Sequence, residues 1–343
     1  MTSITPFAAG SFDSRETARM FVEMRKASQD LERQMATGRK SDVYSGFGFE
    51  RRTALDLRAK LSGFESFGDT MTSANLRLKT MMNSLQGLET IASNTRSAAL
   101  EPLSGIVDGA GVPQEQALAR NNLAFAVEIL NTEINGRHLF AGRASDTRPV
   151  ESYQRILTDL QTAIAGAADP TDPDQIIQAV SDYFDTDVWR PAGSETTLPM
   201  PTTADARQSV IARIDEGQSV AIGARADEPS FRNLLVSLGT LAAAGPLPPE
   251  SFAALSSRVG ALLATDRPQP RDIAMDLGRA QATIAATKER QDASASLLRE
   301  ALDDVELVST EEAAVSLLNL QTRLQASFQT TAMLSRLSLV NYL

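Results

Sequence analysis

The chain has 343 residues, of which 42% are hydrophobic and 22% charged, enough for a sizeable core divided between two or three domains. A net charge of −10 without clustered Lys and Arg argues against nucleic-acid binding, because phosphate neutralisation requires clustered cations. The lack of cysteine removes disulfides, thiolate metal sites and cysteine nucleophiles together.

The N-terminal region predicts one long helix without a preceding secretory signal. Met1–Phe7 has neither a basic segment nor an apolar core, so a cleavable signal peptide is not expected. Ser14 can cap a helix that ends at Gly38, a residue type favoured at helix C-termini. Its a and d positions, which form a weak seam, are Phe21, Met24, Ser28, Leu31 and Met35.

The second predicted helix has the most regular pattern in the chain. Between Leu57 and Ala99, apolar residues keep a heptad register, which predicts a coiled coil roughly 64 Å long at ~1.5 Å per residue. The a positions are Phe64, Met71, Leu78, Leu85, Ala92 and Ala99, and the d positions are Phe67, Ala74, Met81, Leu88 and Thr95.

A third helix is expected after a glycine-rich loop. Pro113 suits its first turn, and Leu123, Val127, Leu130 and Ile134 follow at helical spacing. The dipeptide Asn135-Gly136 then predicts a turn that ends the N-terminal helical arm.

The middle segment, residues 143–270, differs in composition and holds most of the proline residues. Val210–Asp215 and Gln218–Ile222 alternate in polarity around a turn containing Gly217, which predicts a β-hairpin. Short helices are expected at Tyr153–Ala165, Asp174–Phe184, Phe231–Ala244 and Ser251–Ala264. We therefore expect a small α+β module inserted between two helical arms.

The helical pattern resumes after Asp272 and can pair with Leu57–Ala99 in an antiparallel bundle. Its predicted a and d positions are Leu277, Ala280, Ile284, Thr287, Gln291, Ser294, Leu298, Ala301, Val305 and Val308.

The last predicted helix has almost no charged face. Ser309 and Glu312 form a capping box at its start, and only Arg323 and Arg336 are charged after Glu312. Apolar residues surround much of the helix, namely Leu317, Leu320, Leu324, Phe328, Met333, Leu334, Leu337, Leu339, Val340 and Leu343. Such a helix is either central to an ordinary core or buried only in an assembly. The two arginines and many amides argue against a membrane span.

No residue pattern indicates catalysis, a cofactor or a metal. His138 is the only histidine and follows a turn, so a packing or exposed position is expected. The aspartates between Asp169 and Asp187 lack the EF-hand spacing and suit helix capping, while Trp189 suits a core position. We therefore do not expect an enzyme.

Four segments resemble bacterial flagellar axial proteins of the flagellin family. They are Met35–Lys40 (MATGRK), Asn135–Gly142 (NGRHLFAG), Leu324–Gln329 (LQASFQ) and Leu337–Leu343 (LSLVNYL). The ending Asn-Tyr-Leu is more similar to hook-filament junction proteins (hook-associated protein 3) than to flagellins. The Asp-Asp pair usual after the first segment is replaced by Ser41-Asp42.

The resemblance implies a mainly α structural protein: a long antiparallel helical bundle or coiled coil built from both termini, with the inserted α+β module. Expected parts are an N-terminal assembly arm (1–50), bundle segments (51–142 and 271–308), the module (143–270) and a C-terminal assembly helix (309–343). The implied interface comprises Phe21, Met24, Leu31, Met35, Leu317, Leu320, Leu324, Phe328, Leu334, Leu337, Leu339, Val340 and Leu343.

The same resemblance implies self-assembly, contacts with adjacent hook-associated protein and flagellin subunits, and a flagellar export chaperone. It also implies export to the extracellular flagellum without a cleavable signal. Neither nucleic acid nor membrane insertion is expected. Flagellin itself and a soluble coiled-coil secretion or signalling protein are the alternatives.

Overall fold

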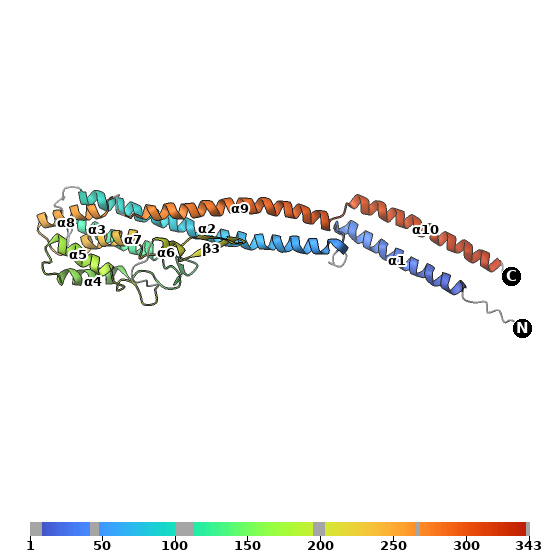
Figure 1. Ribbon diagram of the computed structural model, residues 1–343, viewed down its shortest axis with the longest axis horizontal. Coiled ribbons are helices and arrows are strands. Elements are labelled where there is room, and N and C mark those ends of the chain that lie inside the picture. Colours follow the sequence, from blue (N-terminus) through green and yellow to red (C-terminus); the bar gives the residue numbers. More distant parts are fainter. Residues whose placement is uncertain (1–8, 42–47, 101–112, 195–202, 265–267, 341–343) are drawn as a thin grey trace. The chain divides into compact units, whose positions relative to one another are not determined.

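The computed structural model describes residues 9–41, 48–100, 113–194, 203–264 and 268–340. These residues form a mainly α structure with two small hairpins, as predicted (Figure 1). The helices are α1 (Ala9–Thr37), α2 (Arg51–Leu100), α3 (Gln114–Leu130), α4 (Tyr153–Ala165), α5 (Pro173–Phe184), α6 (Thr203–Gln208), α7 (Pro229–Ala243), α8 (Pro249–Leu262), α9 (Pro270–Glu306) and α10 (Thr310–Val340). The strands are β1 (Glu133–Ile134), β2 (Arg137–His138), β3 (Ile211–Asp215) and β4 (Gln218–Ala221).

The chain divides into two compact units. The terminal unit contains Met1–Phe64 and Gln291–Leu343, and the central unit contains Glu65–Arg290. Helices α2 and α9 each contribute residues to both units.

Helix α2 confirms the predicted heptads. All predicted a and d residues from Met71 to Ala99 are buried, whereas Phe64 and Phe67 are half-buried. The 50-residue helix continues through Gly63, Gly68 and Gly87 without interruption. The apolar seam therefore outweighs the propensity cost of these glycines, about 1 kcal/mol each.

Helix α9 follows its predicted pattern with one exception. Beyond Gln291 the predicted residues Ser294, Leu298, Val305 and Val308 are half-buried, whereas Ala301 is exposed. Ala301 is therefore the one predicted position that is wrong. Ala295 and Glu306 are buried and Leu302 is half-buried beside the predicted positions, so the covered face of α9 is wider here than a strict heptad.

Both hairpins are built on residues with left-handed backbone. The β3–β4 hairpin confirms the prediction: Ala212 and Ile214 face the core, and Gly217 in the turn has φ +75°. In the β1–β2 hairpin, Asn135 and Gly136 have φ of 52° and 73°, which suits a type I′ turn. Ile134 lies in β1 and not on the third helix as predicted, since α3 ends at Leu130.

The central unit has one hydrophobic core to which α2, α3, the middle segment and the start of α9 all contribute. Helix α7 lies at its centre and contacts α3, α4, α5 and α8. Trp189 is fully buried, donates its indole N–H to the Phe184 carbonyl at 3.0 Å and packs edge-on against the Phe184 ring. The helices of residues 143–270 thus share their core with α2 and α3.

Candidate assembly interface

Helices α1 and α10 pair antiparallel in the terminal unit. The paired ends are joined where the Val308 amide donates to the Gly38 carbonyl at 3.0 Å. About five helical turns further along, the rings of Phe21 and Phe328 stack with centroids 4.7 Å apart and planes 12° apart. Gly38, with φ +69°, ends α1 as predicted.

The predicted seam of α1 faces α10 along most of its length. Phe21, Met24 and Leu31 are half-buried, whereas Met35 is exposed. The neighbouring Gln34 is half-buried instead, and its side-chain amide donates to the Lys40 carbonyl at 2.9 Å. The heptad spacing predicts Met35 on the seam because it is apolar. The chain turns at Gly38, however, and the Gln34 side chain is the one that faces inward to bond the Lys40 carbonyl.

Helix α10 covers one row of its residues within the single chain. Ala313 is buried and Leu317, Leu320 and Leu324 are half-buried, at the three- and four-residue spacing of one helix face. Phe328 lies at the edge of this row and keeps more than half of its surface exposed despite its stack on Phe21. This inner row is therefore the α1-facing side of α10.

A second apolar row on α10, the outer row, has no cover in the described chain. It consists of Val315, Leu318 and Met333, which are 59%, 63% and 65% exposed. At about 100° per residue these three positions project from the side opposite the inner row. Thr322 and Gln329, both exposed, continue the outer row without adding charge.

The remaining predicted interface residues lie at the end of the chain. Leu334, Leu337, Leu339 and Val340 belong to α10 by their backbone, but their side chains are outside the described residues. Leu343 also lies outside the described residues.

The start of α10 confirms half of the predicted capping box. The Ser309 hydroxyl accepts a hydrogen bond from the Glu312 amide at 3.3 Å, as the box requires. The same hydroxyl donates its proton to the Glu311 carboxylate at 3.0 Å, so Glu311 and not Glu312 is its acidic partner.

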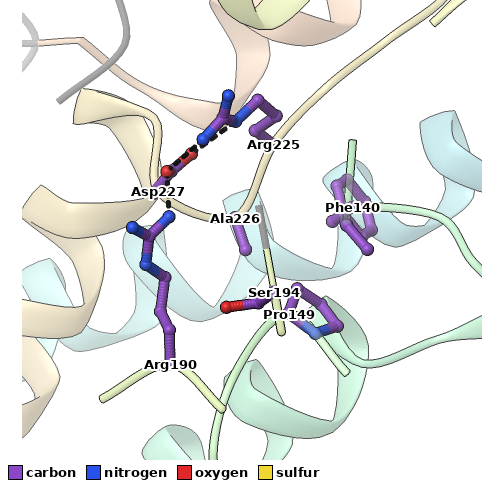
Figure 2. Close-up of a pocket in the computed structure, with 8 residues that line it drawn as sticks. Phe140, Pro149, Arg190, Ser194, Arg225, Ala226 and Asp227 are labelled. Carbon is purple, nitrogen blue, oxygen red and sulfur yellow. Dashed lines mark hydrogen bonds and ion pairs between the residues drawn. The ribbon is translucent and has the colours of Figure 1, made fainter. Parts of the chain in front are cut away.

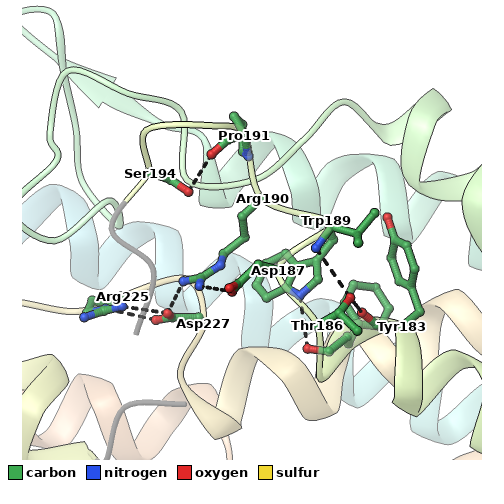
Figure 3. A network of polar contacts seen from close by, with 11 residues as sticks. Tyr183, Thr186, Asp187, Trp189, Arg190, Pro191, Ser194, Arg225 and Asp227 are labelled. Atoms are coloured by element: carbon green, nitrogen blue, oxygen red, sulfur yellow. Dashed lines mark hydrogen bonds and ion pairs between the residues drawn. The ribbon is translucent and has the colours of Figure 1, made fainter. Parts of the chain in front are cut away.

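The central unit holds a buried ionic cluster that was not predicted (Figures 2 and 3). Asp227 is 2% exposed and accepts hydrogen bonds from two arginines. Arg225 donates from Nε and Nη2 at 3.0 and 2.7 Å, and Arg190 donates from Nη1. Arg190 also pairs with Asp187. The carboxylate is thus compensated on both oxygens, which a buried charge requires.

A second ion pair adjoins this cluster in the chain. Glu228 is 1% exposed and receives two hydrogen bonds from Arg207, at 2.6 and 2.9 Å, and one from the Arg225 amide at 2.9 Å. Burial raises the pKa of Glu228 above the ordinary glutamate value, although the hydrogen bonds from Arg207 oppose the shift. Arg207 also lies 3.4 Å from Asp276 of α9.

The ionic cluster shapes the packing around the loop that precedes α7. Figure 2 shows Arg190, Arg225 and Asp227 around a small cavity that Phe140 and Pro149 also line. Its volume of about 10 Å³ is comparable to the space one water molecule needs. Every described carboxylate of the cluster is engaged by an arginine, so the arrangement is suited to holding loops together and not to acid–base chemistry.

The other candidate residues have structural partners. His138 is half-buried, and its Nδ1 lies 2.9 Å from the Asn131 carbonyl. Asp172 caps α5 by accepting from the Asp174 amide at 3.1 Å, as predicted for these aspartates. Asp169 accepts from Thr171, and this bond lowers the pKa of that carboxyl.

Comparison with known proteins gives no family assignment. No protein-family model and no curated protein matches the chain. A solved structure of a proposed flagellar hook-associated protein from Vibrio parahaemolyticus matches 75% of this chain and 97% of its own length, with a TM-score of 0.49 and 8% identity. This likeness is too low to carry an argument. None of the described helices has the length and apolar character needed to cross a bilayer.

Proposed function

We propose that the chain is a non-enzymatic structural subunit that assembles with copies of itself through α1 and α10. The observation that carries the proposal is the outer row of α10, where three large apolar side chains stay mostly exposed on the face opposite α1. Isolated apolar residues are common on protein surfaces, but an aligned, uncharged row of them is typical of an interaction surface. A second helix seated on this row would bury it.

We further propose that the assembly is the bacterial flagellum. Support comes from the four segments that resemble flagellar axial proteins, two of which lie in α10 or its continuation and one at the end of α1. On this proposal the chain is exported without a cleavable signal, is met by an export chaperone and ends outside the cell.

The finer proposal is a hook-filament junction subunit, in contact with another hook-associated protein and with flagellin. The Asn-Tyr-Leu ending and the short middle segment favour this position over that of flagellin. A soluble helical secretion or signalling protein is the second candidate, because the stacked Phe21 and Phe328 show that α10 already has one partner within the chain.

Electron microscopy of cells lacking the chain tests these proposals. A junction subunit predicts hooks without filaments, with unassembled flagellin in the medium, and rescue by the reintroduced chain. Loss of the filament together with loss of the major secreted flagellin would identify the filament subunit instead. Filaments of normal length and attachment would contradict a flagellar role.

A further inference from the structure

Two helix ends meet in the terminal unit, and their contacts define a joint between the α1–α10 pair and the adjoining ends of α2 and α9. Helix α1 ends at Thr37, and α9 ends at Glu306. The residues that follow them pair antiparallel, with Arg39 opposite Leu307. Two backbone hydrogen bonds hold this pairing: the Lys40 amide donates to the Glu306 carbonyl at 2.8 Å and the Val308 amide to the Gly38 carbonyl at 3.0 Å.

The end of α9 is imposed in part by this other segment. Leu307, Val308 and Ser309 include no glycine or proline that would stop a helix. The last carbonyls of α9 are instead satisfied by Lys40, which donates its amide to Glu306 and its ammonium to Asp304 at 3.0 Å. Because Val308 donates to Gly38, its amide is withdrawn from the helical bond to Asp304.

Glu306 supplies the side-chain half of the joint. It is 4% exposed, and its Oε2 accepts from Arg58 of α2 at 2.6 Å and from Arg39 at 3.3 Å. The other oxygen, Oε1, is buried and has no hydrogen-bond partner among the described residues. Arg58 and Arg39 are partly exposed, so the carboxylate is the one member of the group that depends on the others to remain buried.

We propose that Glu306, Arg39 and Arg58 form a latch that sets the direction in which the α1–α10 pair leaves the ends of α2 and α9. The carboxylate reaches one residue from the α1 connector and one from α2, so a single side chain joins three segments. Buried ion pairs contribute little net stability but can select one arrangement among several. Opening the latch leaves each helix intact and lets the pair articulate about residues 307–309.

A larger role for Glu306 in folding is the alternative. It predicts that removing the carboxylate lowers helical content, because α9 and the start of α2 would separate. The latch predicts unchanged helical content and a changed spread of positions. The two outcomes are separable by measuring both quantities on the unassembled chain, and neither depends on whether the chain polymerises.

The experiment is a spin-label distance measurement across the joint. The absence of cysteine allows labels to be placed at Lys60→Cys and Gln321→Cys without background, and both positions are exposed. The parent with both labels is expected to show one narrow distance. Glu306→Gln is expected to lose that narrow peak in favour of a broad distribution. Asp303→Asn, which removes an exposed charge one turn earlier in α9, is the matched control and should retain it.

Circular dichroism of the same samples accompanies the distances. Equal helical content with a broadened distribution in Glu306→Gln supports the latch. A narrow peak that survives Glu306→Gln, or a broad distribution already present in the parent, overturns it. If Glu306→Gln loses helical content, the double variant Arg39→Gln/Arg58→Gln replaces it in the distance measurement. Both guanidiniums are partly exposed, so their removal should open the latch without unfolding the helices. A narrow peak in that variant also overturns the latch.

Discussion

Replacing Leu318 of the outer row by aspartate is expected to block assembly while leaving the free chain folded. Leu318 is 63% exposed, so in the free chain the change is a surface substitution worth within about 0.5 kcal/mol. Together with the lower helix propensity of aspartate, the melting temperature should fall by no more than a few degrees.

The expected effect on assembly is much larger. Full burial of a leucine is worth about 1.5–3 kcal/mol, and most of the Leu318 side chain remains to be buried, which gives about 1–2 kcal/mol per contact. Placing a carboxylate in the same contact adds a desolvation penalty of about 1–3 kcal/mol or more. The sum of about 2–5 kcal/mol corresponds to a roughly 30- to 5,000-fold weaker association.

The assay compares critical concentration by sedimentation with thermal unfolding by circular dichroism. Ser316→Asp is the matched control, since Ser316 is exposed on α10 but projects away from the outer row. The reasoning is refuted if Leu318→Asp polymerises at the wild-type concentration. It is equally refuted if the melting temperature of the free variant falls by much more than a few degrees, since Leu318 would then be buried within the single chain.

Three further predictions concern the central unit. Gly239→Ala should destabilise the fold by about 1–3 kcal/mol, because the added Cβ would lie 2.8 Å from Leu160 Cδ1. Gly278→Ala is the control: its Cβ would meet no atom within 4 Å, so the change should stabilise by up to about 1 kcal/mol. Equal shifts of the urea midpoint in the two variants would contradict this. Asp227→Ala should cost about 3–5 kcal/mol, since two buried arginines lose their shared carboxylate, and an unchanged urea midpoint would show that the cluster does not depend on it. Burial raises the pKa of Glu228, so the folded state holds this proton to higher pH than the unfolded state. Its contribution to stability is present below the ordinary glutamate pKa and is lost as pH rises through the folded value. The stability of Glu228→Gln relative to wild type should therefore improve as pH increases through that window, and a constant difference in urea titrations would disprove the assignment.

Periodic features could be predicted from the sequence because burial in a long helix repeats with the helix. The a and d residues of α2 are all apolar or small from Met71 to Ala99, so one register fits and the opposite face is polar. In α9 one predicted position beyond Gln291, Ala301, is exposed. Leu302 and Val305 are both apolar and both half-buried, so the covered face of α9 includes a position that a strict heptad leaves out.

The sequence predicts the helices α1 and α10, but it does not predict which surface each of them packs against. Both α1 and α10 were expected to bury apolar seams in an assembly, yet Phe21 and Phe328 stack on each other within one chain. The spacing of apolar residues predicts which side of a helix is covered, but it does not indicate whether the covering helix belongs to the same chain or to another subunit. The outer row with Leu318 was not distinguished from the inner row with Leu324 either, because an all-round apolar helix has no clear phase.

The buried ionic cluster could not be predicted from the sequence pattern alone. Arg190, Asp227 and Glu228 lie in loops or at helix starts, where charged residues are usually exposed. Only the fold brings Asp227 between Arg190 and Arg225. One usable hint is the run Arg225–Glu228, in which a cation and two carboxylates stand between a hairpin and a helix that is mostly buried.

The most direct test of assembly through the outer row is the accessibility of a cysteine at position 318 before and after assembly. The chain has no other cysteine, so Leu318→Cys reports from this row alone. If α10 is buried against a second subunit, a maleimide reagent should label Cys rapidly at this position in the free chain and slowly in the assembled form. Equal labelling rates in the two states would contradict the assignment of the outer row as the assembly interface.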